Sequence, residues 1–275
     1  MSSINTETTK NYLSNYSKES VDNRRFYNVG AGNFYHPCWT NLDYGNDWYL
    51  KYKERIDQAL QYDLLSMEPL PLETDKAEVF YTSHTIEHIP NEAVVQLFTE
   101  MHRCLKKGGI VRITAPDIDL VHRAWQEEDL DFFYWIEMNS QEEVWKRRKL
   151  NGPMNKASLE QIFLHLVASS RSQLHIDGTE ERMNDEEFIR LFKELPYAEA
   201  LDAIVKDCPI EIQRKYPGNH MNWWNHKKVM DLLSSVGFSK VYRSGYGQSH
   251  SPAMRDTDLF DNTHPKISFY VEAQK

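Results

Sequence analysis

The sequence has few cysteines, no long apolar run and no excess of positive charge. Its three cysteines form no C-x-x-C pair, which favours reduced thiols in a cytoplasmic protein over disulfides or zinc ligands: Cys38, Cys104 and Cys208. No segment approaches the roughly 20 apolar residues of a membrane-spanning helix, and the polar start MSSINTETTK lacks the apolar centre of a signal peptide. The formal net charge of -9 argues against nucleic acid, because phosphate binding favours a basic surface. We therefore expect a cytoplasmic protein without nucleic-acid or membrane partners.

The string SHTIEHIP, residues 83–90, contains H-x-x-E-H, the spacing with which inverted zinc proteases place two histidines on a metal. That chemistry requires His84 and His88 to lie one turn apart on a continuous helix. Here the string follows a β-rich run, residues 79–82, and Pro90 comes two residues after His88, so a helix cannot continue through it. We therefore predict no metal site and place His84 at the carboxyl end of a strand, where open α/β sheets bind ligands.

The clearest predicted helix begins after Asn91, which we interpret as the N-cap, and ends at Gly108, which supplies a left-handed stop. The β-rich run of residues 79–82 precedes this helix, and a strand at residues 110–116 follows it at once. A strand, a helix and a strand with short joints imply a right-handed crossover and a parallel sheet.

The character of the sequence divides the chain into parts. Residues 1–25 form a polar N-terminal leader, and residues 26–116 and 223–275 alternate between strand and helix patterns. Residues 117–222 show helical segments without a strand of the same quality. We interpret them as a helical insertion between two parts of one α/β domain.

A glycine turn follows the first predicted strand, and an acid ends the second. Gly30 and Gly32 let the backbone come close to a ligand, and Asp43 can accept hydrogen bonds from both hydroxyls of a ribose. A dinucleotide fingerprint needs a third glycine, a helix that holds pyrophosphate and an acid about 20 residues further on. The chain instead has Asn33 and Phe34, and it reaches Asp43 after about half that spacing. A nucleoside that carries a sulfonium and no phosphate fits this turn better.

Taken in order, the motifs NVGAGN, NLDYG, YDLL, VFYTSHTIEHI, MHRCLKKGGIVRITAPD and LLSSVGF resemble class I S-adenosylmethionine-dependent methyltransferases of the type 11-like branch. The resemblance covers roughly residues 26–117 and 226–275. It implies a Rossmann-like, doubly wound, mostly parallel α/β sheet with an antiparallel C-terminal strand. It also implies S-adenosylmethionine as cofactor and S-adenosylhomocysteine as product, with the insertion at residues 117–222 as a lid that forms the acceptor site.

The resemblance further implies a role for each residue of the glycine turn and of the acid that follows it. Gly30, Ala31 and Gly32 are similar to the turn beneath the methionine part of the cofactor. Asp43 is similar to the ribose-binding acid, and Tyr44 would lie beside the adenine.

Other positions complete the expected site. Asp63 and Leu64 stand where the family contacts the adenine, although a solvated turn is an equal alternative for Asp63. Ser83 lies at the strand end nearest the sulfonium. An acceptor that must lose a proton needs a base, and histidine is suited to neutral pH. His84 is the first candidate by position, and His220 is the second because the insertion rejoins the domain there; a structural role stays open for both.

We expect O- or N-methylation of a small polar metabolite or a glycan precursor. Two alternatives from other classes stay open, a nicotinamide-dependent oxidoreductase on a similar sheet and a non-catalytic module that keeps the S-adenosylmethionine fold for binding. The oligomeric state is also left open, with a homodimer as one candidate.

Overall fold

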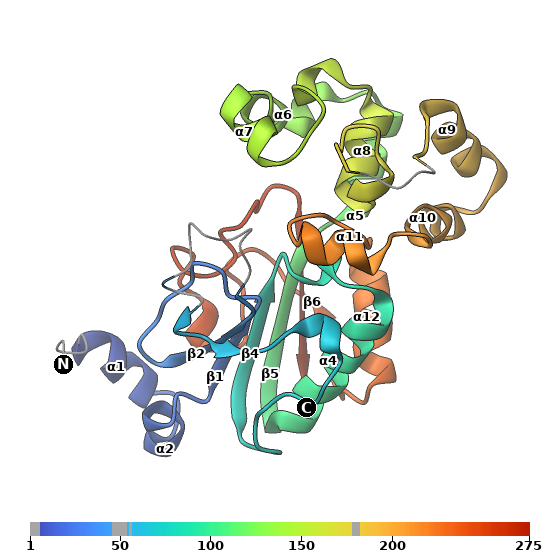
Figure 1. Ribbon diagram of the computed structural model, residues 1–275. Helices are drawn as coiled ribbons and strands as arrows, with labels where there is room; N and C mark the ends of the chain where they lie inside the picture. The colour runs from blue at the N-terminus through green and yellow to red at the C-terminus, as the bar shows by residue number, and fades with distance from the viewer. Residues whose placement is uncertain (1–5, 46–53, 55–56, 178–181) are drawn as a thin grey trace. The chain divides into compact units, whose positions relative to one another are not determined.

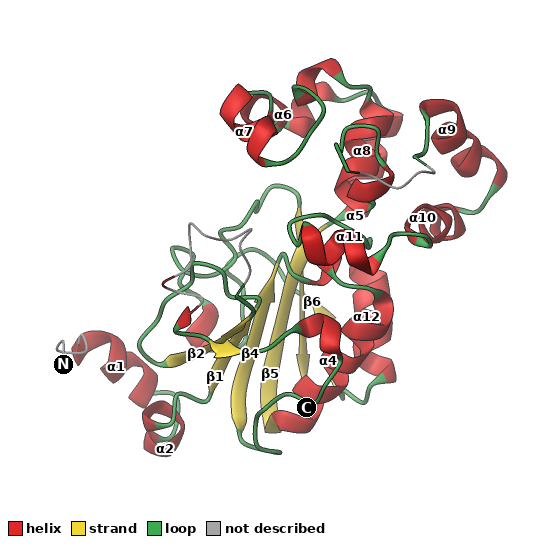
Figure 2. Ribbon diagram, viewed as in Figure 1, coloured by secondary structure: helices red, strands yellow, loops and turns green. Residues whose placement is uncertain are grey.

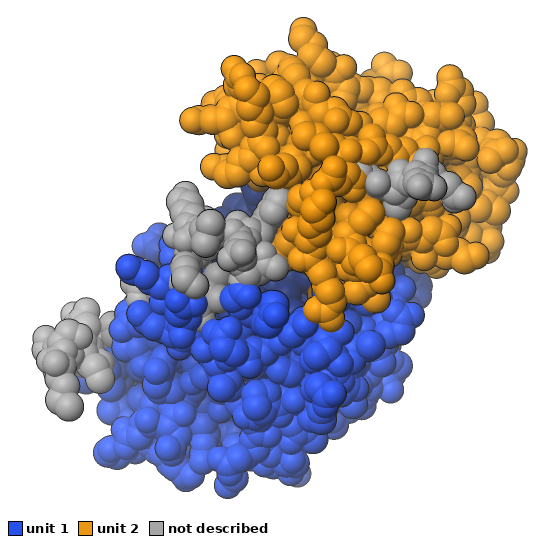
Figure 3. All heavy atoms as spheres, in the orientation of Figure 1, with its two compact units in different colours: residues 1–86, 90–116, 224–275 blue, residues 87–89, 117–223 orange. Residues whose placement is uncertain are grey.

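The computed structural model describes residues 6–45, 54, 57–177 and 182–275. Within these residues the chain forms two compact units (Figure 3). The sheet unit comprises residues 1–86, 90–116 and 224–275, and the helical unit comprises residues 87–89 and 117–223.

A seven-stranded sheet forms the centre of the sheet unit (Figures 1 and 2). In chain order its strands are β1 (Phe26–Val29), β2 (Trp39–Asp43), β3 (Leu60–Gln61), β4 (Ala77–Ser83), β5 (Leu105–Pro116), β6 (Lys240–Arg243) and β7 (Ser268–Gln274). The spatial order is β3-β2-β1-β4-β5-β7-β6. The first five strands in this order pair in parallel, and β7 runs antiparallel to both β5 and β6. This arrangement confirms the predicted doubly wound, mostly parallel sheet with an antiparallel C-terminal strand.

The central strands are apolar because both of their faces are buried. Phe26 on β1, Phe80 on β4 and Phe269 on β7 are each 0% exposed, and so is Val111 on β5. A half-exposed strand would alternate between apolar and polar residues, whereas a strand covered on both faces reads as a continuous apolar run. The short runs seen in the sequence therefore mark the middle of the sheet.

In the described residues of the sheet unit, the α-helices are α1 (Thr6–Leu13), α2 (Lys18–Asp22), α4 (Asn91–Cys104) and α12 (His226–Ser235). Residues 30–38, which connect β1 to β2, form turns and contain no helix. The connection is too short for a long helix, and Pro37 lies within it.

Both predicted ends of α4 need correction. Pro90 occupies the N-cap position without a side-chain bond, and Asn91 is the first helical residue. The helix ends at Cys104, because Leu105 already pairs with Ala77 in the sheet. Gly108 does have a left-handed φ of 82°, but it lies where the pairing of β4 and β5 shifts register, and it does not terminate the helix.

The helical unit contains α5 (Ile118–Gln126), α6 (Ile136–Asn139), α7 (Glu142–Arg147), α8 (Leu159–Val167), α9 (Asp185–Glu194), α10 (Tyr197–Val205) and α11 (Ile210–Lys215). Asn184 and Glu187 form a complete capping box at the start of α9. Phe163 and Phe188 are 0% exposed, and Trp125 packs edge-on against Phe188. No helix in the described part of the chain combines the length and apolar character that a bilayer crossing needs.

The H-x-x-E-H string does not form a helix that carries both histidines. Its residues Ile86–His88 make one 3-10 turn, His84 has a φ of 51°, and α4 begins only at Asn91. The structure therefore agrees with the rejection of an inverted zinc protease.

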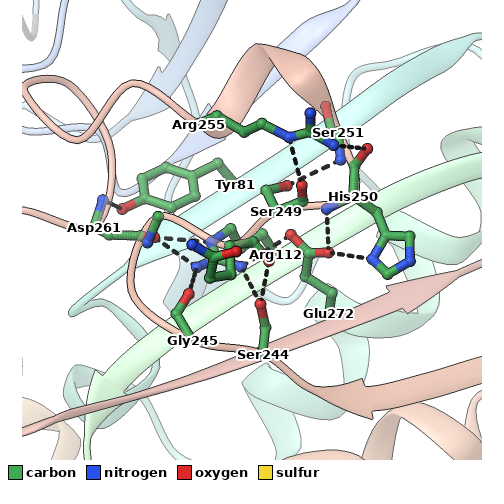
Figure 4. A network of polar contacts seen from close by, with 12 residues as sticks. Tyr81, Arg112, Ser244, Gly245, Ser249, His250, Ser251, Arg255, Asp261 and Glu272 are labelled. Atoms are coloured by element: carbon green, nitrogen blue, oxygen red, sulfur yellow. Dashed lines mark hydrogen bonds and ion pairs between the residues drawn. The ribbon is translucent and has the colours of Figure 1, made fainter.

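A buried charge network joins β5 to the C-terminal part of the sheet unit (Figure 4). Arg112, Asp261 and Glu272 each have side chains that are 0% exposed. Arg112 donates from Nε and Nη2 to Asp261 at 2.9 and 2.5 Å, and from Nη1 to Glu272 Oε1 at 2.9 Å. Its remaining donors reach Ser244 Oγ at 3.0 Å and the Gly245 carbonyl at 2.8 Å. All five guanidinium hydrogens are therefore used inside the protein.

Candidate functional site

The predicted cofactor residues follow the carboxyl ends of four adjacent parallel strands. The strands lie in the order β3, β2, β1, β4, and they end at Gln61, Asp43, Val29 and Ser83. Parallel strands present their carboxyl ends at one edge of the sheet, and open α/β sheets bind ligands at that edge. The sheet order thus places the glycine turn, Asp43 and Ser83 along a common edge.

The glycine turn requires both of its glycines. Gly30 has a φ of 68°, and a Cβ at this position would lie 2.3 Å from Thr85 Oγ1. Gly32 has a φ of 52°, and a Cβ there would meet nothing within 4 Å. Gly30 therefore permits close packing against the chain after β4, while Gly32 leaves open space beside the backbone.

Asp43 holds the turn in place. Its Oδ2 accepts a hydrogen bond from the Gly32 N–H at 2.6 Å, and its Oδ1 accepts one from the Tyr44 N–H at 2.7 Å. Burial raises the pKa of the Asp43 carboxyl, and these two backbone bonds oppose the rise. A carboxylate can accept about four hydrogen bonds, so two backbone donors leave capacity for the two hydroxyls of a ribose.

The residues predicted beside the adenine lie next to this edge. Tyr44 is 50% exposed, and Asp63 and Leu64 are half-buried. The Asp63 Oδ1 accepts a hydrogen bond from the Leu65 N–H at 2.9 Å and caps a 3-10 turn. Asp63 therefore has the local turn role that the sequence left open, and its contact with adenine stays a prediction.

His84 follows β4 in a constrained conformation. Its φ of 51° is unusual for a residue with a side chain, and its N–H donates to the Thr114 carbonyl at 2.9 Å. His84 Nε2 lies 2.8 Å from Ser268 Oγ, and the Ser268 hydroxyl lies 2.9 Å from the His264 carbonyl. Because that carbonyl can only accept, Ser268 donates to it and accepts from His84 Nε2–H. The neutral His84 ring then carries its lone pair on Nδ1.

The other predicted base, His220, belongs to the helical unit and lies beside Glu87 and His88. The rings of His88 and His220 are edge-on, with centroids 4.7 Å apart. The two candidate bases are thus in different units, and the structure brings His220 together with the second half of the H-x-x-E-H string.

Sequence reasoning missed two features. Thr85, which packs against Gly30, gives no sequence signal because a threonine after a strand is common. The grouping of Glu87, His88 and His220 could have been suspected only from the abundance of histidine and acid in residues 84–88, since His220 lies far away in the sequence.

Comparison with known proteins gives a family match for part of the chain. Residues 38–113 match the family model described as a methyltransferase domain. No curated protein sequence matches the chain.

Solved structures with partial likeness are also methyltransferases. One from Mesorhizobium loti is 14% identical, with a TM-score of 0.42, over 91% of this chain and 90% of its own. One from Thermotoga maritima is 11% identical, with a TM-score of 0.39, over 91% and 82%. Human N-acetylserotonin methyltransferase in complex with S-adenosylmethionine is 10% identical, with a TM-score of 0.38, over 98% of this chain and 51% of its own. Likeness at this level supports neither an acceptor nor a mechanism for this chain.

Proposed function

We propose an acceptor class and site residues for this chain, which is a class I S-adenosylmethionine-dependent methyltransferase. The acceptor is a small polar metabolite or a glycan precursor, and the methyl group goes to an oxygen or a nitrogen atom. The observation that carries the site assignment is the contact between Asp43 and the Gly32 N–H at the carboxyl edge of the sheet.

The residues at this edge fit the cofactor. When bound, S-adenosylmethionine supplies a methyl group on a positively charged sulfur. Gly30, Ala31 and Gly32 would bind its methionine part, because the open space at Gly32 admits a ligand close to the backbone. Asp43 would accept hydrogen bonds from the ribose, with Tyr44, Asp63 and Leu64 towards the adenine and Ser83 towards the sulfonium.

His84 is our candidate for the base that removes a proton from the acceptor. Its bond to Ser268 fixes the neutral tautomer with the lone pair on Nδ1, which can take up a proton. Its left-handed backbone is a conformation that costs about 1–3 kcal/mol and is often retained at functional sites. Methyl transfer otherwise depends mainly on positioning and on the exclusion of water.

The helical unit is proposed to supply residues that select the acceptor. Two of its four tryptophans, Trp135 and Trp223, are below 10% exposed and belong to the core. Tyr134 is 40% exposed and Trp145 is partly exposed, and such rings can stack on a sugar or another flat group.

Calorimetric titration with S-adenosylhomocysteine tests the cofactor site. We expect binding to the wild type and no binding of NAD. Asp43→Asn should weaken binding by tenfold or more, because hydrogen bonds to a charged group contribute about 1.5–3 kcal/mol each. Asp231→Ala, which changes an acid whose side chain is 65% exposed on α12, is the matched control. Equal affinity in wild type and Asp43→Asn would remove Asp43 from the site.

A metabolite screen for the mass gain of one methyl group tests the acceptor class. With an acceptor in hand, His84→Ala should lower turnover by about 10²–10⁴-fold while the affinity for S-adenosylhomocysteine changes little. His250→Ala, whose side chain is 71% exposed, is the control. An unchanged turnover number would exclude His84 as the base, and methylation of protein lysines alone would contradict the acceptor class.

A further inference from the structure

Three potential metal ligands converge inside the helical unit. Glu87, His88 and His220 each offer one ligand atom, and these atoms all lie within 4.8 Å of one another. Glu87 is 2% exposed, and its Oε1 lies 3.9 Å from His88 Nε2. A buried carboxylate beside two imidazoles is a ligand set that zinc and other divalent transition metals take in proteins.

Hydrogen bonds fix the tautomers of both histidines. His88 Nδ1 lies 2.8 Å from the Asn219 carbonyl, and His220 Nδ1 is bonded to the Leu166 carbonyl. Because a carbonyl oxygen can only accept, each Nδ1 must carry the hydrogen, and each neutral ring then has its lone pair on Nε2. Metal-binding histidines commonly donate their second ring N–H to a backbone carbonyl, which fixes the tautomer and the ring orientation.

The two segments that carry the ligands are joined by their backbones. The Met221 N–H donates to the Glu87 carbonyl at 2.9 Å, and Asn222 Nδ2 donates to the Ile89 carbonyl at 3.1 Å. These bonds hold residues 87–89 against residues 219–222.

A second pair of bonds holds His220 from the other side. The His220 N–H donates to Ser169 Oγ at 2.9 Å, and the Ser169 N–H donates to the His220 carbonyl at 2.9 Å. The ligands are therefore positioned by ordered backbone that is independent of any ion, as preorganised binding requires.

We propose that Glu87, His88 and His220 bind one divalent transition-metal ion, with zinc as the preferred ion. Two imidazole nitrogens and one carboxylate oxygen leave at least one coordination position for water or another oxygen ligand. Neighbouring ligand atoms in a tetrahedral zinc site are about 3.4 Å apart, so binding requires a side-chain shift of about 1 Å. The site lies within the helical unit alone and does not depend on the proposed acceptor. It assigns His220 as a ligand and leaves His84 as the candidate base.

Zinc binding to the full-length chain tests the proposal directly. The protein is stripped with EDTA, exchanged into chelator-free buffer and titrated with ZnCl₂ in a calorimeter, and bound metal is counted by mass spectrometry. We expect one zinc ion per chain. Co²⁺ in place of zinc should give the visible absorption bands of a low-coordinate nitrogen and oxygen site.

The variants are chosen to remove a ligand while keeping the surrounding bonds. His88→Asn and His220→Asn retain a side-chain N–H near the position of Nδ1, so the bonds to Asn219 and Leu166 can persist. Glu87→Gln keeps the volume of the side chain. Each should weaken zinc binding by more than about 100-fold, because even indirect ligand partners contribute 10–100-fold. His250→Asn, in the sheet unit, should bind like the wild type.

Two results would overturn the proposal. One is a wild-type chain that binds no zinc and gives no Co²⁺ bands, an outcome that does not require any variant to fold. The other is zinc binding of equal affinity and stoichiometry in wild type, Glu87→Gln and His220→Asn, which would assign the metal to surface histidines.

Discussion

Each unit surrounds one buried ionisable side chain with polar partners, Arg112 in the sheet unit and Glu87 in the helical unit, and the two sets of partners differ. In the sheet unit, Arg112 lies between the carboxylates of Asp261 and Glu272, and all five of its donors have acceptors in the protein (Figure 4). In the helical unit, Glu87 lies beside the rings of His88 and His220, and each of these three side chains can ligate a metal. Every donor of the Arg112 network has an acceptor, so that network is complete without a further partner. The ligand atoms of Glu87, His88 and His220 instead favour the binding of a cation.

The largest expected effect is the loss of the arginine. Arg112→Met should lower the free energy of unfolding by about 3–5 kcal/mol, because the carboxylates of Asp261 and Glu272 would remain buried without their counter-charge. Urea unfolding followed by circular dichroism measures the change. A loss below about 1 kcal/mol would mean that water replaces the guanidinium and that the network is not closed.

The second largest effect is expected from zinc binding to Glu87, His88 and His220 in the helical unit. Free zinc at 100 times its dissociation constant should stabilise the wild type by about 2.7 kcal/mol, since a ligand that binds only the folded state shifts the equilibrium by mass action. Thermal unfolding with zinc and then with excess EDTA measures this gain and its reversal. His220→Asn should show no gain; an equal gain would place the metal elsewhere.

The third effect is a pH dependence of stability that comes from His36, a buried histidine that the fold keeps neutral. Burial lowers the pKa of His36 to about 4, and its Nδ1 accepts a hydrogen bond from the Cys38 N–H at 3.1 Å. The unfolded chain, with a histidine pKa near 6.5, therefore binds the proton more tightly. The neutral His36 ring therefore contributes its full stabilisation of the fold above pH 6.5, and this contribution to the free energy of unfolding is lost as the pH falls from 6.5 to 4.

At pH 5 the free energy of unfolding is lower by at most about 2 kcal/mol because of His36. Unfolding free energies at pH 7.5 and pH 5, for wild type and for His36→Asn, measure it. The variant can still accept from Cys38 but cannot take up a proton, so its pH dependence should be smaller. Equal pH dependence in the two proteins would show that His36 does not remain neutral in the fold.

The smallest effect is expected where charges are exposed. Lys227 and Asp231 form an ion pair one turn apart on α12, with side chains 82% and 65% exposed. Lys227→Ala should change the free energy of unfolding by less than about 0.5 kcal/mol, because solvent and salt screen such pairs. A larger loss would show that burial is not what distinguishes the Arg112 network from a surface pair.

Much of the sheet could be predicted because its signals are local. Short apolar runs located β1, β2, β4 and most of β5, and they placed the glycine turn and the acid at the ends of β1 and β2. Adjacent parallel strands bring their carboxyl ends to one edge, and there the structure adds a contact between Asp43 and the Gly32 N–H.

The ends of α4 could not be predicted in the same way. Asn91, Lys106, Lys107 and Gly108 are ordinary helix-end residues, but the pairing of Leu105 with Ala77 draws the chain into β5 before the glycine is reached. Sheet pairing overrode local propensity, as tertiary contacts commonly do.

By itself, the sequence determined the run of strands, the capping box of α9 and the glycine turn with its acid, because each depends on residues only a few positions apart. The tertiary structure alone decided which distant groups meet. Arg112 finds acceptors 149 and 160 residues away, and His88 bonds to a carbonyl 131 residues away. Such meetings leave no periodic or spacing signal, since they arise only when separately formed segments pack and bury the same polar atoms together.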